Sequence, residues 1–179
     1  MQIELQKLGS SVSVSSGLDG ITFTTQSLKK NIDKTLALLE ERMLQPKFTQ
    51  ESFSRLQKQT LEAFKLRKSQ PASVADDVLG ELSYGQGHIL GMNSLGTEFS
   101  VKNLSLKDVE SYYNNFITSK DAKLVVVGDI TESEVLTKLA FLKKLPNKEV
   151  KLPTLAAAPA IDKTRIYLVD IPKAAQTQF

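Results

Sequence analysis

The 179-residue sequence predicts an α+β fold in which helices cover one face of an antiparallel-rich sheet. Two short runs near the N-terminus alternate apolar and polar residues, which is the pattern of half-buried strands. Longer stretches then repeat apolar residues every three or four positions, which is the pattern of amphipathic helices. A later run, LVVVGD at 124–129, has the β-branched composition of a strand that is buried on both faces.

The first two predicted strands form an antiparallel hairpin. In SVSVSS, Val12 and Val14 lie on one face of a strand and serines lie on the other. In GITFTTQ, Ile21 and Phe23 show the same alternation. The residues between the two runs are rich in Gly and Asp, so a turn is expected to pair the strands. IELQKL at 3–8 is expected to belong to the same sheet.

Three helices are predicted in the next part of the chain. The first ends at Pro46, the second runs from about Thr49 to Lys68, and the third begins at Pro71 and ends in a glycine-rich stretch. Their inward-facing residues recur at helical spacing: Leu28, Ile32, Leu36, Leu39 and Met43 in the first, Phe53, Leu56, Ala63 and Phe64 in the second, and Val74, Val78 and Leu82 in the third.

Two more helices and two strands are predicted in the rest of the chain. Ser105 and Asp108 have the spacing of a helix start, and Thr131 and Glu134 have the spacing of a capping box. LVVVGD between these helices is expected to be the central strand, and RIYLVDI at 165–171 is expected to be the last one. The helix faces consist of Val109, Tyr112, Tyr113 and Phe116 in the first and Val135, Leu139 and Leu142 in the second.

These elements predict a domain organisation in three parts. Residues 1–145 form a partial αβ domain, 146–163 form a linker rich in Pro, Ala and Lys, and 164–179 hold the first strand of a following domain. A single strand after a linker needs a partner, so the chain is expected to end just inside that second domain.

The composition excludes several classes of protein. An apolar fraction of 41% and a charged fraction of 24% are ordinary for a soluble domain, and no apolar run approaches the ~20 residues that cross a bilayer. The net charge of +3 comes from scattered lysines, without the basic stripe of a nucleic-acid-binding face. The absence of cysteine excludes disulfides and thiolate chemistry.

The sequence predicts no catalytic, cofactor-binding or metal-binding residue. GQGHILG at 85–91 has the wrong spacing for a dinucleotide fingerprint, and VVVGDITESE lacks the lysine of a phosphate loop. The carboxylates of Glu40 and Glu41, or of Asp76 and Asp77, point apart on a helix, so neither pair converges on a ligand. His88 is the only histidine, and one histidine cannot build a zinc site, so we interpret it as a polar loop residue.

The order of several stretches resembles the pitrilysin/insulinase-type zinc metallopeptidases, the family that includes the mitochondrial processing peptidases. The stretches are LGSSVSVSSGLDGITFTTQSL, the two helices joined through Leu44, Pro46 and Phe48, GHILGMNSLGT, and LVVVGDITESEV. The resemblance implies a truncated half-domain of that fold from the non-catalytic C-terminal half. It also implies that His88 is not a zinc ligand.

Family members that cleave peptides carry an inverted His-x-x-Glu-His motif and a distal glutamate. This sequence has no such motif, and Ala63 occupies the position that best matches the distal glutamate, with Glu62 beside it. The resemblance therefore implies no zinc in this chain, and zinc in the catalytic half of the parent protein or in a partner. The chain by itself is expected to be inactive, although its parent resembles a zinc metalloendopeptidase.

The predicted role is to help form the peptide-binding chamber of a protease. The expected partners are the catalytic half of the same chain or a partner peptidase subunit, a peptide substrate, and a second copy of the chain through self-association. A non-catalytic subunit of a two-chain peptidase and a stand-alone α+β protein-binding module remain as alternatives. The sequence is compatible with the bacterial periplasm or cytoplasm and does not indicate the substrate peptides.

Overall fold

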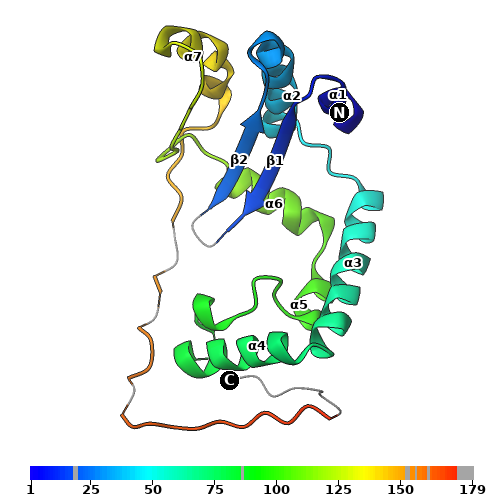
Figure 1. The fold of residues 1–179 in the computed structure, drawn as a ribbon, viewed down its shortest axis with the longest axis vertical. Coiled ribbons are helices and arrows are strands. Elements are labelled where there is room, and N and C mark those ends of the chain that lie inside the picture. Colours follow the sequence, from blue (N-terminus) through cyan, green and yellow to red (C-terminus); the bar gives the residue numbers. More distant parts are fainter. Residues whose placement is uncertain (18–19, 86, 152–153, 156, 161, 173–179) are drawn as a thin grey trace. The chain divides into compact units, whose positions relative to one another are not determined.

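The computed structural model describes residues 1–17, 20–85, 87–151, 154–155, 157–160 and 162–172. The chain forms two compact units, whose elements are drawn in Figure 1. The first unit contains Met1–Phe48 and Glu110–Lys151, and the second contains Thr49–Val109 and the described part of 152–179. Among the described residues, no helix combines the length and apolar character needed to cross a membrane.

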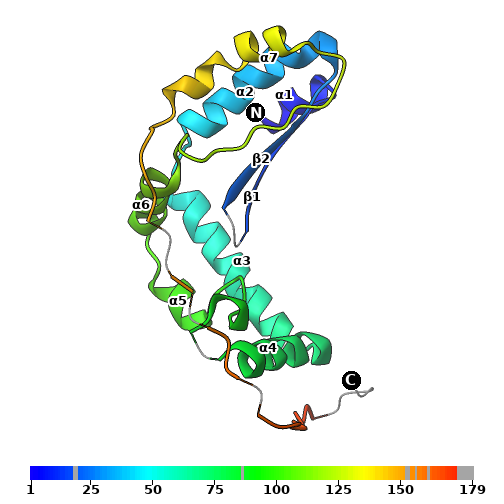
Figure 2. The same cartoon turned by 90° about the vertical axis from the view of Figure 1, so that its left-hand side faces the viewer.

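The first unit is built around the hairpin of β1 (Ser11–Ser16) and β2 (Ile21–Gln26). The strands are antiparallel, with Val12 opposite Thr25 and Ser13 opposite Thr24, which confirms the predicted hairpin. Helix α2 (Ile32–Leu44) packs against one face, and Figure 2 shows α2 and α7 (Glu132–Lys138) on the same side of the hairpin. The sheet therefore has a covered face and an exposed face.

The covered face carries the core of the first unit. Its buried residues come from elements far apart in the sequence, so the helices and the hairpin stabilise one another through apolar burial. The unit also contains α1 (Gln2–Lys7), the 3-10 helices Lys29–Asn31 and Ala140–Lys144, and most of α6 (Leu106–Phe116). The buried core residues are Leu5, Val12, Leu39, Met43 and Phe141, and Phe23, Leu36, Leu139 and Leu142 pack against them.

Polar contacts hold α2 in register with the strands. Thr35 is fully buried, and its hydroxyl lies 2.8 Å from Ser10 Oγ and 2.9 Å from the carbonyl oxygen of Asn31. Arg42 Nη1 donates to the carbonyl oxygen of Val12 at 2.6 Å. Because a buried hydroxyl without partners is costly, this network favours one placement of the helix.

Tyr113 joins α6 to the end of α2. Its hydroxyl donates to the carbonyl oxygen of Met43, and its ring meets the ring of Phe48 edge-on with centroids 5.4 Å apart. Burial raises the pKa of the Tyr113 hydroxyl. The contact spans 70 positions of sequence, so it helps close the first unit.

The second unit consists of helices. They are α3 (Gln50–Lys68), α4 (Pro71–Tyr84), the short 3-10 helix Ile89–Gly91 and α5 (Glu98–Asn103). Thr49 caps α3 and Pro71 stands at the start of α4, as the sequence predicts. Gln57 ties α3 to α5, since its side-chain amide donates to the carbonyl oxygen of Val101 at 2.8 Å.

The prediction of a central strand at LVVVGD (124–129) is wrong. The structure places Leu124–Val127 outside any strand, with Val125 84% and Val127 94% exposed. β-Branched composition favours a strand only where a neighbouring strand supplies hydrogen bonds. In the described part of the chain, the only paired strands are β1 and β2, so residues 124–129 have no partner strand.

Three smaller predictions are also wrong. Residues 3–8 belong largely to helix α1, because Leu5 and Leu8 face the unit at a helical spacing. RIYLVDI is extended and exposed, without a strand partner among residues 162–172 or elsewhere in the described chain. Several residues predicted to face inward are exposed, because neighbouring elements cover only part of each helix; they are Leu28, Leu56, Ala63, Leu82, Tyr112 and Phe116.

Candidate functional site

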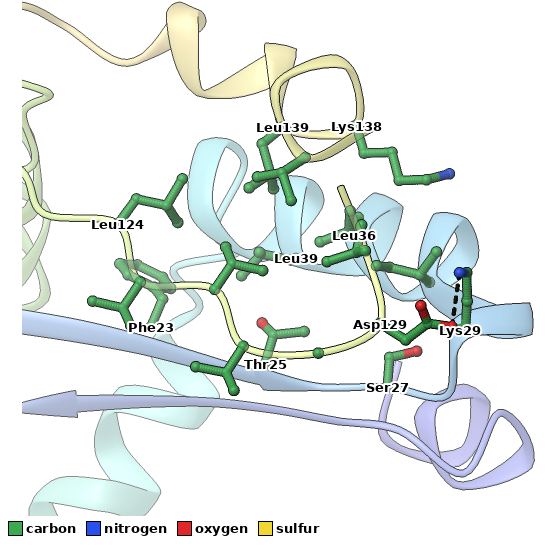
Figure 3. A pocket seen from close by; sticks show the side chains of 17 residues that line it. Phe23, Thr25, Ser27, Lys29, Leu36, Leu39, Leu124, Asp129, Lys138 and Leu139 are labelled. Carbon is green, nitrogen blue, oxygen red and sulfur yellow. Dashed lines mark hydrogen bonds and ion pairs between the residues drawn. The ribbon is translucent and has the colours of Figure 1, made fainter. Parts of the chain in front are cut away.

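The first unit contains an apolar pocket of about 270 Å³. It lies between β2, α2, α7 and the extended residues 124–130, which run alongside β2 in Figure 3. Six of its 17 lining residues are ones that the sequence correctly places on the inward faces of a strand and two helices. The lining includes Phe23, Thr25, Ile32, Leu36, Leu39, Val126, Val135 and Leu139.

An ion pair closes one end of this pocket. Lys29 Nζ lies 2.9 Å from Asp129 Oδ2, and this hydrogen bond raises the pKa of Lys29. Lys138 also contacts Asp33 at this end. Within the pocket, the hydroxyl of Thr25 is buried and has no hydrogen-bond partner. Sequence reasoning missed these groups because Lys29 and Asp129 are 100 residues apart and no local pattern links them.

The pocket is suited to binding apolar groups, because most of its lining side chains are apolar. Among the described residues, its charged side chains are paired, Lys29 with Asp129 and Lys138 with Asp33 outside the lining, and its one unpaired buried polar group is a hydroxyl. Nor does the described part of the chain bring together three or more His, Cys, Asp or Glu side chains that could hold a metal ion.

His88 is a structural residue in the second unit. Only 8% of it is exposed, its Nδ1 accepts the backbone N–H of Leu90 at 3.1 Å, and its ring stacks on Tyr84 with centroids 5.3 Å apart. The structure places His88 just after α4, outside any helix or strand, and its side chain is buried there. It caps the 3-10 helix Ile89–Gly91.

A charged cluster holds the same loop to the helices. Arg67 donates to both carboxylate oxygens of Asp77, at 2.8 and 2.7 Å, and Asn93 donates to Asp77 Oδ1 at 3.2 Å. The Arg67 guanidinium lowers the pKa of Asp77. Nearby, Glu98 accepts from Lys102 and Lys68, which lower its pKa to about 2. These contacts connect α3, α4, α5 and the loop.

The position expected for a distal glutamate is not part of a ligand set. Ala63 is exposed on α3, and the neighbouring Glu62 accepts a hydrogen bond from Lys65 at 2.9 Å. Neither residue belongs to a candidate metal group in the described chain.

The exposed face of the β1–β2 hairpin is uniformly polar and uncharged. Cross-strand pairs bring serine opposite threonine or glutamine along the whole hairpin. Such side chains donate and accept hydrogen bonds without selecting a charge. The exposed side chains are Ser11, Ser13, Ser15, Thr22, Thr24 and Gln26.

Comparisons with known proteins agree on one family. Residues 1–89 match the family model for insulinase, peptidase family M16, and residues 103–179 match the model for the peptidase M16 inactive domain. No curated protein matches the chain.

Two solved structures share the fold. A peptidase M16 inactive domain from Pseudomonas fluorescens is 21% identical, with a TM-score of 0.79. A protease from Helicobacter pylori is also 21% identical, with a TM-score of 0.67. In both cases the match covers 88% of this chain and 39% of the other, so the chain spans about two-fifths of the length of these relatives.

Proposed function

Because the chain belongs to the peptidase M16 (insulinase) family, we propose that it is a non-catalytic domain that helps form the peptide-binding chamber of a zinc metallopeptidase. The substrate class is peptides or unfolded protein segments. The zinc and the hydrolytic groups belong to another domain, either in the same polypeptide or in a partner subunit.

The observation that carries this proposal is the exposed polar face of the hairpin. Six neutral hydroxyl and amide side chains form this face, while the opposite face is buried by α2. A chamber that accepts peptides of varied sequence needs a solvent-exposed surface that offers hydrogen-bonding groups and carries no fixed charge. Serine and threonine side chains fit that requirement, because they can both donate and accept.

The chemistry of the described residues supports a non-catalytic role. They offer no group of metal-ligating side chains, and the C-terminal 77 positions match a family model whose description is an inactive domain. The chain alone is therefore expected neither to retain zinc nor to cleave peptides.

Two arrangements of the catalytic half are consistent with the matches. The solved relatives are more than twice as long as the matched region, which supports a catalytic half in the same polypeptide. A separate catalytic subunit is the second arrangement. Family membership weighs against the third alternative, a stand-alone module unrelated to peptidases.

Reconstitution tests the proposal. The purified chain is mixed with a zinc-containing M16 half that carries the His-x-x-Glu-His motif, and cleavage of a quenched fluorescent peptide is followed. We expect no cleavage by the chain alone and an increase in kcat/KM of at least about tenfold when both are present, because the second wall orients the peptide. Chelator-sensitive cleavage by the chain alone, or no increase on mixing, would refute the proposal.

Two matched variants test the role of the polar face. Thr24→Arg places a bulky charge on the exposed face of the hairpin, and Ser54→Arg places the same charge on the exposed surface of α3. Thr24→Arg should raise KM for the peptide in the reconstituted assay, whereas Ser54→Arg should leave it unchanged. Equal effects would show that the hairpin face does not contact the substrate.

A further inference from the structure

Residues 146–148, here called the exit segment, are held by a single threonine side chain. The hydroxyl of Thr118 lies 2.7 Å from the carbonyl oxygen of Lys148 and 3.0 Å from that of Pro146, so it can donate its hydrogen to either oxygen. The same hydroxyl accepts the backbone N–H of Lys148 at 3.2 Å. Thr118 thus donates to and accepts from one residue, as the backbone of a paired antiparallel strand does.

Other groups near Thr118 add to this contact. The backbone N–H of Ser119 donates to the carbonyl oxygen of Pro146 at 2.8 Å, and the Ser119 hydroxyl lies 3.3 Å from the same oxygen. The side-chain amine of Lys148 donates to the carbonyl oxygen of Asn114 in the last turn of α6, where a cation is favourable. Both ends of the exit segment are therefore bonded to the end of α6 or to the turn that follows it.

The turn after α6 holds the Thr118 hydroxyl in position. Ile117, just before it, is only 8% exposed, and the backbone N–H of Lys120 donates to the Thr118 hydroxyl at 3.0 Å. Asp121 has a φ of 58°, in the left-handed region that aspartate adopts more readily than most residues. A hydroxyl can donate one hydrogen bond and accept two, so the hydrogen-bonding capacity of Thr118 is fully used.

The exit segment lies just before the chain passes from the first unit to the second. The first unit ends at Lys151. In the described part of the chain, Lys148 is the last residue with a hydrogen bond to the first unit. The described residues beyond Lys151 are exposed as far as 170; they are 154–155, 157–160 and 162–170.

We propose that Thr118 is a positioning residue whose hydroxyl fixes the exit segment on the first unit and so sets the direction in which the chain continues beyond Lys151. The role belongs to the hydroxyl, because the hydroxyl makes every one of these side-chain bonds to the exit segment. The inference does not rest on the role in a peptidase chamber. Its test measures the motion of the exit segment, whereas reconstituted cleavage tests the proposed function, so the two can fail separately.

A nitroxide label beside the exit segment gives the direct measurement. The chain contains no cysteine, so Glu149→Cys creates a single labelling site at an exposed position. Thr118→Val removes the hydroxyl and keeps the branched shape of the side chain. The electron paramagnetic resonance spectrum should then show a faster label, and the amide of Lys148 should exchange about tenfold faster, as expected for the loss of one hydrogen bond. Thr118→Ser keeps the hydroxyl and should behave like the wild type.

Thr60→Val is the matched control for loss of a threonine hydroxyl. The Thr60 hydroxyl donates to the carbonyl oxygen of Leu56 within α3, so its removal should leave the label at position 149 unchanged. The urea midpoint of the first unit, measured for each variant, separates a local release of the exit segment from unfolding.

A second pair of variants reaches the same contact through the turn. Asp121→Val puts a β-branched residue at a φ of 58°, where it is strained, and should mobilise the label as Thr118→Val does. Asp121→Gly removes that constraint and should leave the label unchanged. This pair tests the proposal even if Thr118→Val does not fold. A label that stays slow in both valine variants, or a Thr118→Ser label as fast as that of Thr118→Val, would overturn the proposal, as would an equal response to Thr60→Val.

Discussion

Gly91 lies where the loop that contains His88 meets α4, and replacing it with alanine gives a sharp test of that packing. A Cβ atom at Gly91 would lie 2.6 Å from the carbonyl oxygen of Gly85 and 3.2 Å from that of Gly80. Both obstacles are backbone atoms, which cannot rotate away as the end of a side chain can. Gly91→Ala therefore forces the loop away from α4, and overpacking of this kind costs about 1–3 kcal/mol.

Gly80→Ala is the matched control, because it adds the same methyl group from the other side of this contact. Its Cβ atom would lie 3.4 Å from the carbonyl oxygen of Leu90, an ordinary contact distance. Gly80 is also inside α4, where alanine is favoured over glycine by about 1 kcal/mol. The same chemical change should thus be neutral or stabilising at 80 and destabilising at 91.

Hydrogen exchange measured by mass spectrometry locates the effect. In Gly91→Ala, peptides covering α4 and residues 88–97 should exchange about 5- to 150-fold faster than in the wild type, which corresponds to the loss of about 1–3 kcal/mol. Peptides from α2 and the hairpin should be unchanged, and Gly80→Ala should exchange no faster than the wild type. If Gly91→Ala is as well protected as Gly80→Ala, the close approach described here is incorrect.

Three further outcomes follow from the packing and the charges. Leu39→Ala removes a buried core side chain, so urea denaturation should show the first unit destabilised by about 3 kcal/mol, and wild-type stability would refute its burial. Thr131→Ala breaks the cap formed with Glu134 and should cost α7 about 1 kcal/mol, seen as faster amide exchange in that helix alone. The lowered pKa of Asp77 means that its ionised form stabilises the second unit above the ordinary pKa of 3.8, and that this stabilisation is lost as the pH falls through the lower folded-state pKa. Asp77→Asn should remove this acid dependence of the urea midpoint in that unit, and an unchanged profile would contradict the role of the pair with Arg67.

Local signals predict the helices of this chain well, because caps act within a few residues. Thr131 and Glu134 form the predicted capping box, and the hydroxyl of Ser105 donates a hydrogen bond to the carboxylate of Asp108 at the start of α6. Helix α5 is absent from the elements predicted from the sequence, although Thr97 and Ser100 form a capping box there too. The signal was present, but serine is a less familiar member of that motif than glutamate.

The elements that sequence reasoning misplaced depend on partners distant in the chain. LVVVGD has strand composition, but composition does not show which strand lies beside it. The pocket was not predicted for the same reason. Its walls are β2, α2, α7 and residues 124–130, which are distant in the sequence and meet only in the folded chain. The expectation that the hairpin has one polar face was confirmed, since strand alternation is fixed by local geometry alone.

The interrupted order of the first unit has a consequence for biosynthesis. The first 48 residues of this unit leave the ribosome first. Residues 49–109, which belong to the second unit, follow, and the rest of the first unit starts only at Glu110. At roughly 5–20 residues per second, the hairpin and α2 wait about 3–13 s for Tyr113 and about 5–19 s for Phe141. During that interval only the hairpin covers the apolar side of α2 on the nascent chain, and the part that later packs on Phe141 is exposed. A chaperone that binds exposed apolar segments should therefore crosslink to α2 at intermediate chain lengths and release it once residues beyond Lys144 have emerged.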